Sequence, residues 1–193
     1  MVAFLAARLI ARAEATGVIP AADEPQQFSP SLLSDALSAF GKLGVGHQAI
    51  MIIDRGRSPN EVLKALIALD DEVETSPLPK TEWRALSSRL GMALLGRLVG
   101  ISDSSIRRYS APKTTGRTTP TDVAGRLHFL ALVVAELAGG YNTHGIRRWF
   151  ERPRSRLGGL SPAELLVGDW DPETDGPQQV RALAASLSAS PAT

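Results

Sequence analysis

The sequence predicts an all-α protein, and three observations support this fold class. Along most of the 193-residue chain, apolar residues recur three and four residues apart, which is the spacing of one face of a helix. Ser58-Pro59-Asn60-Glu61 and Ser161-Pro162-Ala163-Glu164 each have the form of a capping box with proline at the first helical position. Glycine and proline clusters separate the periodic segments. A hydrophobic content of 44% with 21% charged residues fits an ordinary soluble protein.

The composition limits the chemistry and the location of the protein. The chain has no cysteine, which excludes disulfides and thiolate chemistry and gives no indication of export. It contains no apolar run of the roughly 18 to 20 residues that span a membrane. Arg8 and Arg12 interrupt the N-terminal apolar segment, which is therefore a poor signal peptide. These features predict a cytoplasmic protein with no membrane partner.

Charge is distributed unevenly along the chain, although the net charge is only +1. Residues 80–156 carry fourteen Lys and Arg against five Asp and Glu, a net of +9. Residues 1–79 carry six against ten and residues 157–193 one against five, a net of −4 in each segment. Clustered cations favour nucleic-acid phosphates because their binding releases counterions. A solvated basic surface without a ligand has the same composition, and charge alone does not separate the two.

Two helices with clear apolar faces are expected in residues 1–79, which we predict to be an N-terminal helical subdomain. The first spans residues 1–16, and the second begins at the Ser58 cap. The predicted inward-facing residues are Phe4, Leu5, Leu9 and Ile10 in the first helix and Val62, Leu63, Leu66, Ile67 and Val73 in the second. The acidic run Asp70-Asp71-Glu72 lies at the helix end that the dipole disfavours for carboxylates. Pro77-Leu78-Pro79 marks the end of the subdomain.

The segment between these two helices is less regular. A linker rich in Pro, Gln, Asp and Glu covers residues 17–30, and a short helix is expected over residues 32–40. Gly41, Gly44 and Gly46 follow without the Lys-Ser/Thr pair of a phosphate-binding loop, which argues against nucleotide binding. Residues 48–53 fit a strand or a helix by periodicity, and their helical neighbours favour a helix.

Residues 92–111 resemble a helix-turn-helix within the second predicted region, residues 80–140. Its apolar positions are Leu95, Val99, Ile101, Ile106 and Tyr109. Gly96 lies where the two helices cross closely, and Gly100 lies at the turn, where glycine adopts a left-handed backbone without strain. Ser102 is expected to cap a second helix that begins at Asp103.

The outward face of this second helix has the chemistry for DNA binding. Arginine takes guanine edges bidentately or holds phosphates, while serine hydroxyls and N-terminal amides suit phosphate oxygens. The predicted DNA-binding residues are Ser102, Asp103, Ser104, Ser105, Arg107 and Arg108, with Lys113 and Arg117 in the following loop. The alternative is an αα-hairpin whose basic helix and loop are merely solvated.

A long helix is expected from Pro120 to Leu137. Its apolar stripe comprises Val123, Leu127, Leu130, Val134 and Leu137, widened by Leu132 and Val133. Such a broad apolar face predicts that this helix is central in the fold or forms a dimer contact. Gly139-Gly140 closes it.

The third predicted region, residues 141–193, begins with a helix whose apolar face carries Ile146, Trp149 and Phe150. Pro153 ends this helix, and Gly158-Gly159 supplies a tight reversal before the Ser161 cap. The motif residues are Trp149-Phe150, Pro153, Leu157-Gly158-Gly159, Ser161-Pro162 and Leu165-Leu166. This run resembles the C-terminal toxin-binding domain of the Xre/MbcA/ParS antitoxins over about residues 141–187. The alternative is a helical hairpin in which Trp149 is simply a core residue.

The resemblance implies a type II antitoxin that binds and neutralises a cognate RES-domain toxin, a class that acts on NAD, and represses its own operon. It implies two partners, the toxin and operator DNA, and assembly as a homodimer and as a hetero-oligomer with the toxin. The implied toxin-binding residues are Arg148, Trp149, Arg152, Pro153, Arg156, Leu157, Gly158, Gly159 and Leu160, with Val180, Leu183 and Leu187 of a last helix. The alternatives are a helix-turn-helix regulator without a toxin partner and a toxin binder that no longer binds DNA.

No residue pattern predicts catalysis. His47, His128 and His144 lack the spacing of a metal site, and no serine lies in a Gly-x-Ser-x-Gly motif. His128 falls within the long apolar helix, where a hydrogen-bonded core histidine is expected. We therefore expect no cofactor, no metal and no enzymatic activity.

Overall fold

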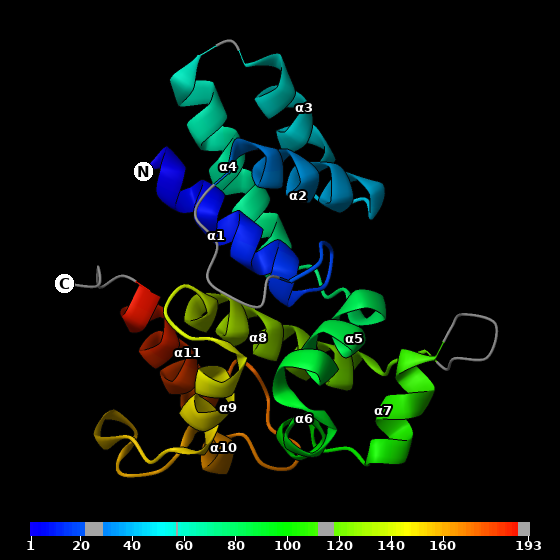
Figure 1. Cartoon of the computed structure of the whole chain (residues 1–193), viewed down its shortest axis with the longest axis vertical. Coiled ribbons are helices and arrows are strands. Elements are labelled where there is room, and N and C mark those ends of the chain that lie inside the picture. Colours follow the sequence, from blue (N-terminus) through cyan, green and yellow to red (C-terminus); the bar gives the residue numbers. More distant parts are fainter. Residues whose placement is uncertain (22–28, 57, 112–117, 189–193) are drawn as a thin grey trace.

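The computed structural model describes residues 1–21, 29–56, 58–111 and 118–188. Within these ranges the fold is all-α, as predicted, with eleven α-helices, one short 3-10 helix and no strand. The first four helices form the upper half of the molecule in Figure 1, and α8 lies across its middle with α5 and α11 beside it.

The helices of the upper half are α1 (Val2–Ala15), α2 (Pro30–Lys42), α3 (His47–Arg55) and α4 (Pro59–Glu74). Those of the lower half are α5 (Pro79–Leu90), α6 (Met92–Val99), α7 (Asp103–Ser110), α8 (Thr121–Ala138), α9 (Thr143–Glu151), the 3-10 helix η1 (Ser155–Leu157), α10 (Pro162–Leu165) and α11 (Asp175–Ser188). The segment that fits a strand or a helix by periodicity is therefore helical, as favoured.

Buried apolar side chains form two clusters. The smaller cluster lies among α1, α2, α3 and α4, and its fully buried members include Leu9, Phe40, Leu66 and Leu69. The larger cluster takes residues from every helix from α5 to α11. The helix-turn-helix region and the C-terminal region therefore share one hydrophobic core.

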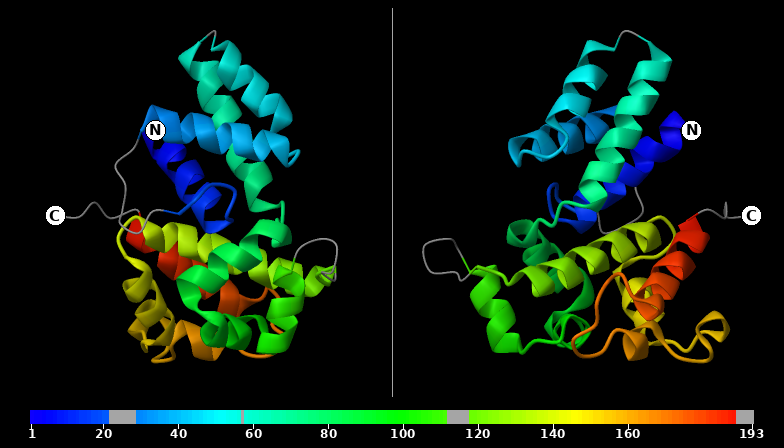
Figure 2. Two further views of the ribbon diagram at one scale, coloured as in Figure 1. Left: turned by 45° about the vertical axis from the view of Figure 1, so that its right-hand side comes forward. Right: turned by 180° about the vertical axis from the view of Figure 1, so that it is seen from behind.

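Helix α8 is the central element of the larger cluster, as one of the two predicted alternatives required. It packs against α1 as well as α5, α9 and α11 (Figure 2). All five residues of its predicted stripe are buried within one chain, namely Val123, Leu127, Leu130, Val134 and Leu137. They are therefore not available as a dimer contact. No single helix in the described ranges has the length and apolarity to span a membrane; α8 and α9 meet that criterion only together, as a pair bent by 118°.

Two predicted core residues of the upper half are exposed instead. Phe4 has 50% of its surface accessible and Ile67 has 40%. The buried stripe of α1 runs through Leu5, Leu9 and Ala13, and Phe4 lies just outside it. Ile67 lies outside the stripe of α4 in the same way, because that stripe continues through Leu66, Leu69 and Val73.

Local hydrogen bonds fix the ends of α4. The Ser58 hydroxyl accepts from the Glu61 N–H at 3.2 Å, which is one half of the predicted capping box. Near the C-terminal end of α4 the helix dipole disfavours negative charge, but the carboxylates there have specific partners. Glu72 accepts from the Gly46 N–H at 2.7 Å, and Asp70 forms ion pairs with Arg8 and Arg12. Tertiary pairing thus accounts for an acidic run that helix electrostatics alone would disfavour.

A polar network connects the two halves of the molecule around Arg12, which is 1% exposed. Its guanidinium lies 2.9 Å from an Asp70 carboxylate oxygen, donates to the Asp70 carbonyl at 2.7 Å and donates to Glu74 at 2.8 Å. Glu74 also pairs with Arg181 of α11 at 2.9 Å. Burial lowers the pKa of Arg12, and the hydrogen bond to Glu74 opposes this effect. The network therefore ties α1 and α4 to the lower half.

The buried pair Glu82–His128 continues this network inside the lower half. His128 Nδ1 lies 2.6 Å from Glu82 Oε1, and His128 Nε2 lies 3.1 Å from the Glu74 carbonyl oxygen. A carbonyl only accepts, so Nε2 carries a proton, and Nδ1 and Glu82 share one further proton between them. Burial of Glu82 raises the pKa of its carboxyl group against the opposing effect of the His128 hydrogen bond. His128 is thus the hydrogen-bonded core histidine that the sequence predicts.

Replacing Glu82 with Gln should change the pH dependence of stability. The folded chain holds the Glu82 proton more tightly than the unfolded chain, because the pKa of this carboxyl group is raised on folding. The protonated carboxyl group therefore contributes fully to stability at low pH, and this contribution is lost as the pH rises above 4.5, the ordinary pKa of a glutamate. Glutamine donates to Nδ1 without titrating, so the variant should gain stability relative to the wild type as pH rises. Urea unfolding between pH 4.5 and 8 measures this difference. The exposed substitution Glu61→Gln is the control, and parallel pH curves for Glu82→Gln and the wild type would contradict the assignment.

Candidate functional site

Helices α6 and α7, joined by a short turn at Gly100, cover the residues for which the sequence predicts a helix-turn-helix. Gly100 at the turn has φ +77°, the left-handed conformation that the motif requires. A Cβ at Gly96 would lie 2.9 Å from the Ile101 carbonyl oxygen, so the two helices approach as closely as predicted. Ile106 of α7 is 1% exposed and packs in the larger cluster with Leu95 and other residues of α6. The geometry of the motif follows directly from these small and apolar positions.

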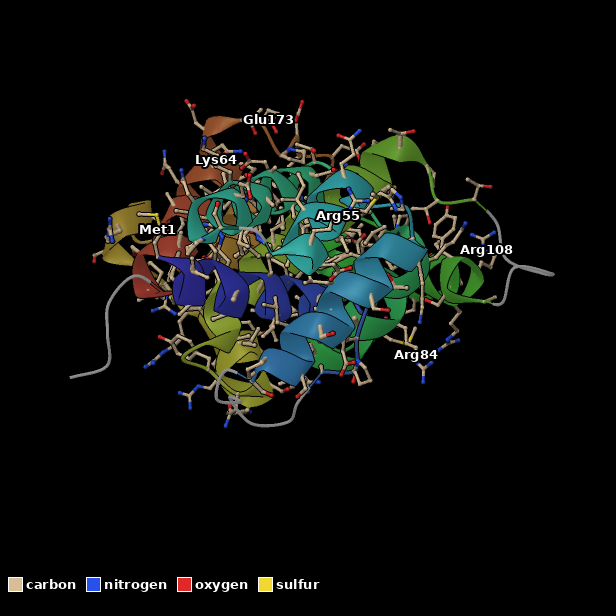
Figure 3. The ribbon with its side chains drawn as sticks, turned by 90° about the horizontal axis from the view of Figure 1, so that it is seen from above. Met1, Arg55, Lys64, Arg84, Arg108 and Glu173 are labelled. Atoms are coloured by element: carbon tan, nitrogen blue, oxygen red, sulfur yellow. The ribbon has the colours of Figure 1, made fainter. Side chains whose placement is uncertain are left out.

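The outer face of α7 presents the predicted DNA-binding residues to solvent. Ser102, Asp103, Ser104, Arg107 and Arg108 are exposed, and Ser105 is half-buried. The Ser102 hydroxyl caps the helix by accepting from the Ser105 N–H at 3.3 Å, and Arg108 donates to the Ser105 hydroxyl at 2.9 Å. Arg108 lies at the rim of the molecule in Figure 3. Lys113 and Arg117 lie outside the described residues.

Helix α5 holds the C-terminal end of α7 in place. The rings of Trp83 and Tyr109 stack with centroids 5.8 Å apart and an interplanar angle of 17°. The Trp83 indole also donates to the Thr119 hydroxyl at 3.0 Å, which connects α5 to the residues just before α8. Sequence reasoning identified Tyr109 as an inward position but did not identify Trp83 as its partner. The sequence signal that could have identified it is the position of Trp83 in the helix directly before α6.

The second candidate surface is the loop between α9 and α10. Asn142 caps α9 by accepting from the Gly145 N–H at 2.9 Å, and the chain reverses at Gly158 and Gly159, with φ of 65° and 88°. The Arg154 N–H donates to the Leu160 carbonyl at 2.9 Å and closes the loop. Both halves of the predicted capping box form at Ser161 and Glu164. Local sequence therefore determines the shape of this loop.

Burial divides the predicted toxin-binding residues into two groups. Eight are exposed: Arg148, Arg152, Pro153, Arg156, Gly158, Gly159, Leu160 and Leu187. Four are buried in the larger cluster, with exposed fractions of 1% for Trp149, 4% for Leu157, 0% for Val180 and 9% for Leu183. The apolar faces of α9 and α11 are covered by this chain's own core, so these four side chains are not exposed for direct contact in this structure. They support the surface from beneath.

Trp149 illustrates this support. Its ring meets Phe150 edge to face, with centroids 5.2 Å apart, and the Arg154 guanidinium lies 5.5 Å from the centre of the same ring. Arg156 donates to the Ser186 hydroxyl of α11 at 3.0 Å, which joins the loop to the last helix. The remaining surface, which we call the arginine loop, consists of Arg148, Arg152, Pro153, Arg156, Gly158, Gly159 and Leu160. It is a cationic surface that also exposes two apolar side chains, Pro153 and Leu160, the latter at 44% exposure.

The two candidate surfaces have the chemistry for binding other macromolecules. Arginine and serine on an exposed helix suit phosphates and base edges, and the arginine loop suits an acidic protein surface. The described part of the chain contains no group of three or more His, Asp or Glu side chains placed to hold a metal ion. Comparison with protein-family models, with curated proteins and with solved structures gives no significant match for this chain.

Proposed function

We propose that this chain is a type II antitoxin that neutralises a cognate RES-domain toxin and represses its own operon. The observation that carries the proposal is the presence of two separate exposed surfaces that carry arginines, both built on one core. The outer face of α7 bears Arg107 and Arg108 in a helix-turn-helix, and the arginine loop carries the antitoxin-like motif. The family assignment rests on that motif's residues alone.

Operator binding would use the outer face of α7. A recognition helix enters the major groove with its N-terminal residues leading, and in this chain Ser102, Asp103 and Ser104 are at that end. Operators read by helix-turn-helix proteins are usually inverted repeats, which match a two-fold dimer. We therefore propose a homodimer in the cytoplasm that binds such a repeat and joins the toxin in a hetero-oligomer.

Toxin binding would use the arginine loop, with Leu160 as its apolar anchor. Exposed arginines are frequent hot spots at protein interfaces, and truncating one such residue typically costs about 2 kcal/mol. The toxin surface that it fits is therefore acidic, with a small apolar recess. The action of the toxin class on NAD comes from the family resemblance.

Replacing Arg148 and Arg152 together with alanine should weaken toxin binding at least about tenfold. The test is co-expression with the product of the neighbouring gene, which the proposal expects to be a RES-domain toxin, followed by co-purification and titration. The matched control removes two exposed cations elsewhere, Arg55 and Lys64 of α3 and α4 (Figure 3). A wild-type chain that neither co-purifies with that toxin nor rescues cells from it would favour a helix-turn-helix regulator without a toxin partner.

A further inference from the structure

The segment of residues 167–170, between α10 and α11, lies directly against the turn of the helix-turn-helix. Trp170 is 8% exposed, and its indole N–H donates to the Leu98 carbonyl at 2.7 Å. Its ring meets Phe129 of α8 edge to face, with centroids 5.1 Å apart and an angle of 69°. Trp170 therefore bridges the end of α6 and the central helix α8.

The hydrogen bond to Leu98 satisfies a group that the helix itself leaves without a partner. The last four carbonyls of an α-helix have no intrahelical donor, and Leu98 is the penultimate residue of α6. A buried carbonyl without a donor is costly, so the indole stabilises one particular ending of α6. That ending determines where the turn at Gly100 begins and hence where α7 points.

Two further contacts hold the same segment in place. A Cβ at Gly100 would lie 2.7 Å from the Gly168 carbonyl oxygen, so the backbone of the segment touches the backbone of the turn. The buried guanidinium of Arg126 pairs with Asp169 at 2.9 Å and with Asp122 at 2.9 Å. The segment is thus attached to α6, to the turn and to α8 by three separate interactions.

We propose that Trp170 is a positioning residue for DNA recognition, acting by fixing the end of α6 and the orientation of α7. This inference rests on the proposed DNA-binding function of α7. Trp170 lies outside the helix-turn-helix in sequence, and its buried ring packs against α6 and α8 instead of reaching the outer face of α7. Its effect is on geometry, because base readout requires α7 to enter the groove at a defined angle.

The test compares Trp170→Phe with Trp149→Phe. Phenylalanine keeps a ring against Phe129 but removes the donor to Leu98. Trp149 is also buried, but its indole nitrogen has no hydrogen-bond partner among the described residues, and its ring packs on Phe150. Both variants lose similar bulk, and only the first should alter α7. The probes are a duplex from the sequence upstream of this gene and a duplex of unrelated sequence, at one salt concentration.

We expect Trp170→Phe to bind the upstream duplex roughly five- to tenfold more weakly, the worth of one buried hydrogen bond, with binding to the unrelated duplex unchanged. Amide hydrogen exchange should increase over residues 98–105 in this variant only. Asp169→Asn removes an exposed partner of Arg126 and keeps the fold, so it should show the same trend at about twofold.

Equal effects of Trp170→Phe and Trp149→Phe on DNA discrimination and on exchange would overturn the positioning role. An unchanged preference for the upstream duplex over the unrelated duplex in both Trp170→Phe and Asp169→Asn would also overturn the positioning role. A wild-type chain with no preference for the upstream duplex would instead overturn the proposed operator binding, which makes the two failures distinguishable.

Discussion

Replacing Asp70 with alanine should lower the free energy of unfolding by about 3–5 kcal/mol, because it leaves the buried Arg12 charge without one of its two carboxylate partners, the one that is itself buried. Both side chains are 2% exposed, so water cannot take the place of the carboxylate. Glu74 remains near the guanidinium but is shared with Arg181. Because total stabilities are typically roughly 5–15 kcal/mol, this single change should remove a large fraction of the stability of the fold. Urea denaturation at neutral pH measures the difference.

The neighbouring substitution Asp71→Ala is the control for this experiment. It removes the same charge from the same helix, but the Asp71 side chain is exposed, and its removal should cost less than about 0.5 kcal/mol. Combining Asp70→Ala with Arg12→Met should recover part of the stability, since a buried apolar side chain needs no counter-charge. Equal stabilities of Asp70→Ala and Asp71→Ala would show that the network around Arg12 contributes little.

Replacing Arg107 and Arg108 together with alanine should weaken operator binding at least about a hundredfold. Each arginine that binds a guanine edge contributes roughly 1–3 kcal/mol of discrimination, and each that holds a phosphate adds to the electrostatic attraction. Both side chains are exposed, so the fold should be unaffected. Titration of an upstream duplex at several salt concentrations measures the affinity, and the salt slope should fall by about one for each phosphate that the variant no longer neutralises.

The matched control for this pair is again the double variant Arg55→Ala with Lys64→Ala. It removes the same number of positive charges from α3 and α4, which are distant from α7 in the sequence. It should leave affinity and salt slope nearly unchanged if binding is local to α7. Equal reductions in both double variants would indicate non-specific attraction to the overall charge. An unchanged affinity in the Arg107 and Arg108 variant would remove α7 from the DNA interface and favour a toxin binder that does not bind DNA.

The turn between α6 and α7 and the loop between α9 and α10 were predictable because their determinants are local. Gly96 and Gly100 permit a close crossing and a left-handed turn, and Ser102 caps the helix that follows. The Ser161–Glu164 box forms within four residues. In each case a residue favours a particular backbone geometry at its own position. The local structure can therefore be predicted without knowledge of contacts to distant parts of the chain.

The partners of the apolar faces were not predictable in this way. A helical stripe such as Ile146, Trp149 and Phe150 indicates that one face is buried, but not whether this chain or another covers it. Here α9 and α11 cover their apolar faces within one chain, so Trp149 and Val180 are core residues. Trp170 and Arg12 act through residues distant in sequence, Leu98 and Asp70, and one sequence carries no signal of such pairs.

The packing of α1 on α8 bears on how this protein can be dissected. Helix α8 belongs to the core of residues 80–188, yet part of its surface is covered by a helix from the beginning of the chain. A fragment starting at residue 80 would leave that part of α8 bare and His128 without the Glu74 carbonyl. Such a fragment should aggregate, so truncation studies of the DNA-binding region need α1 and α4 retained.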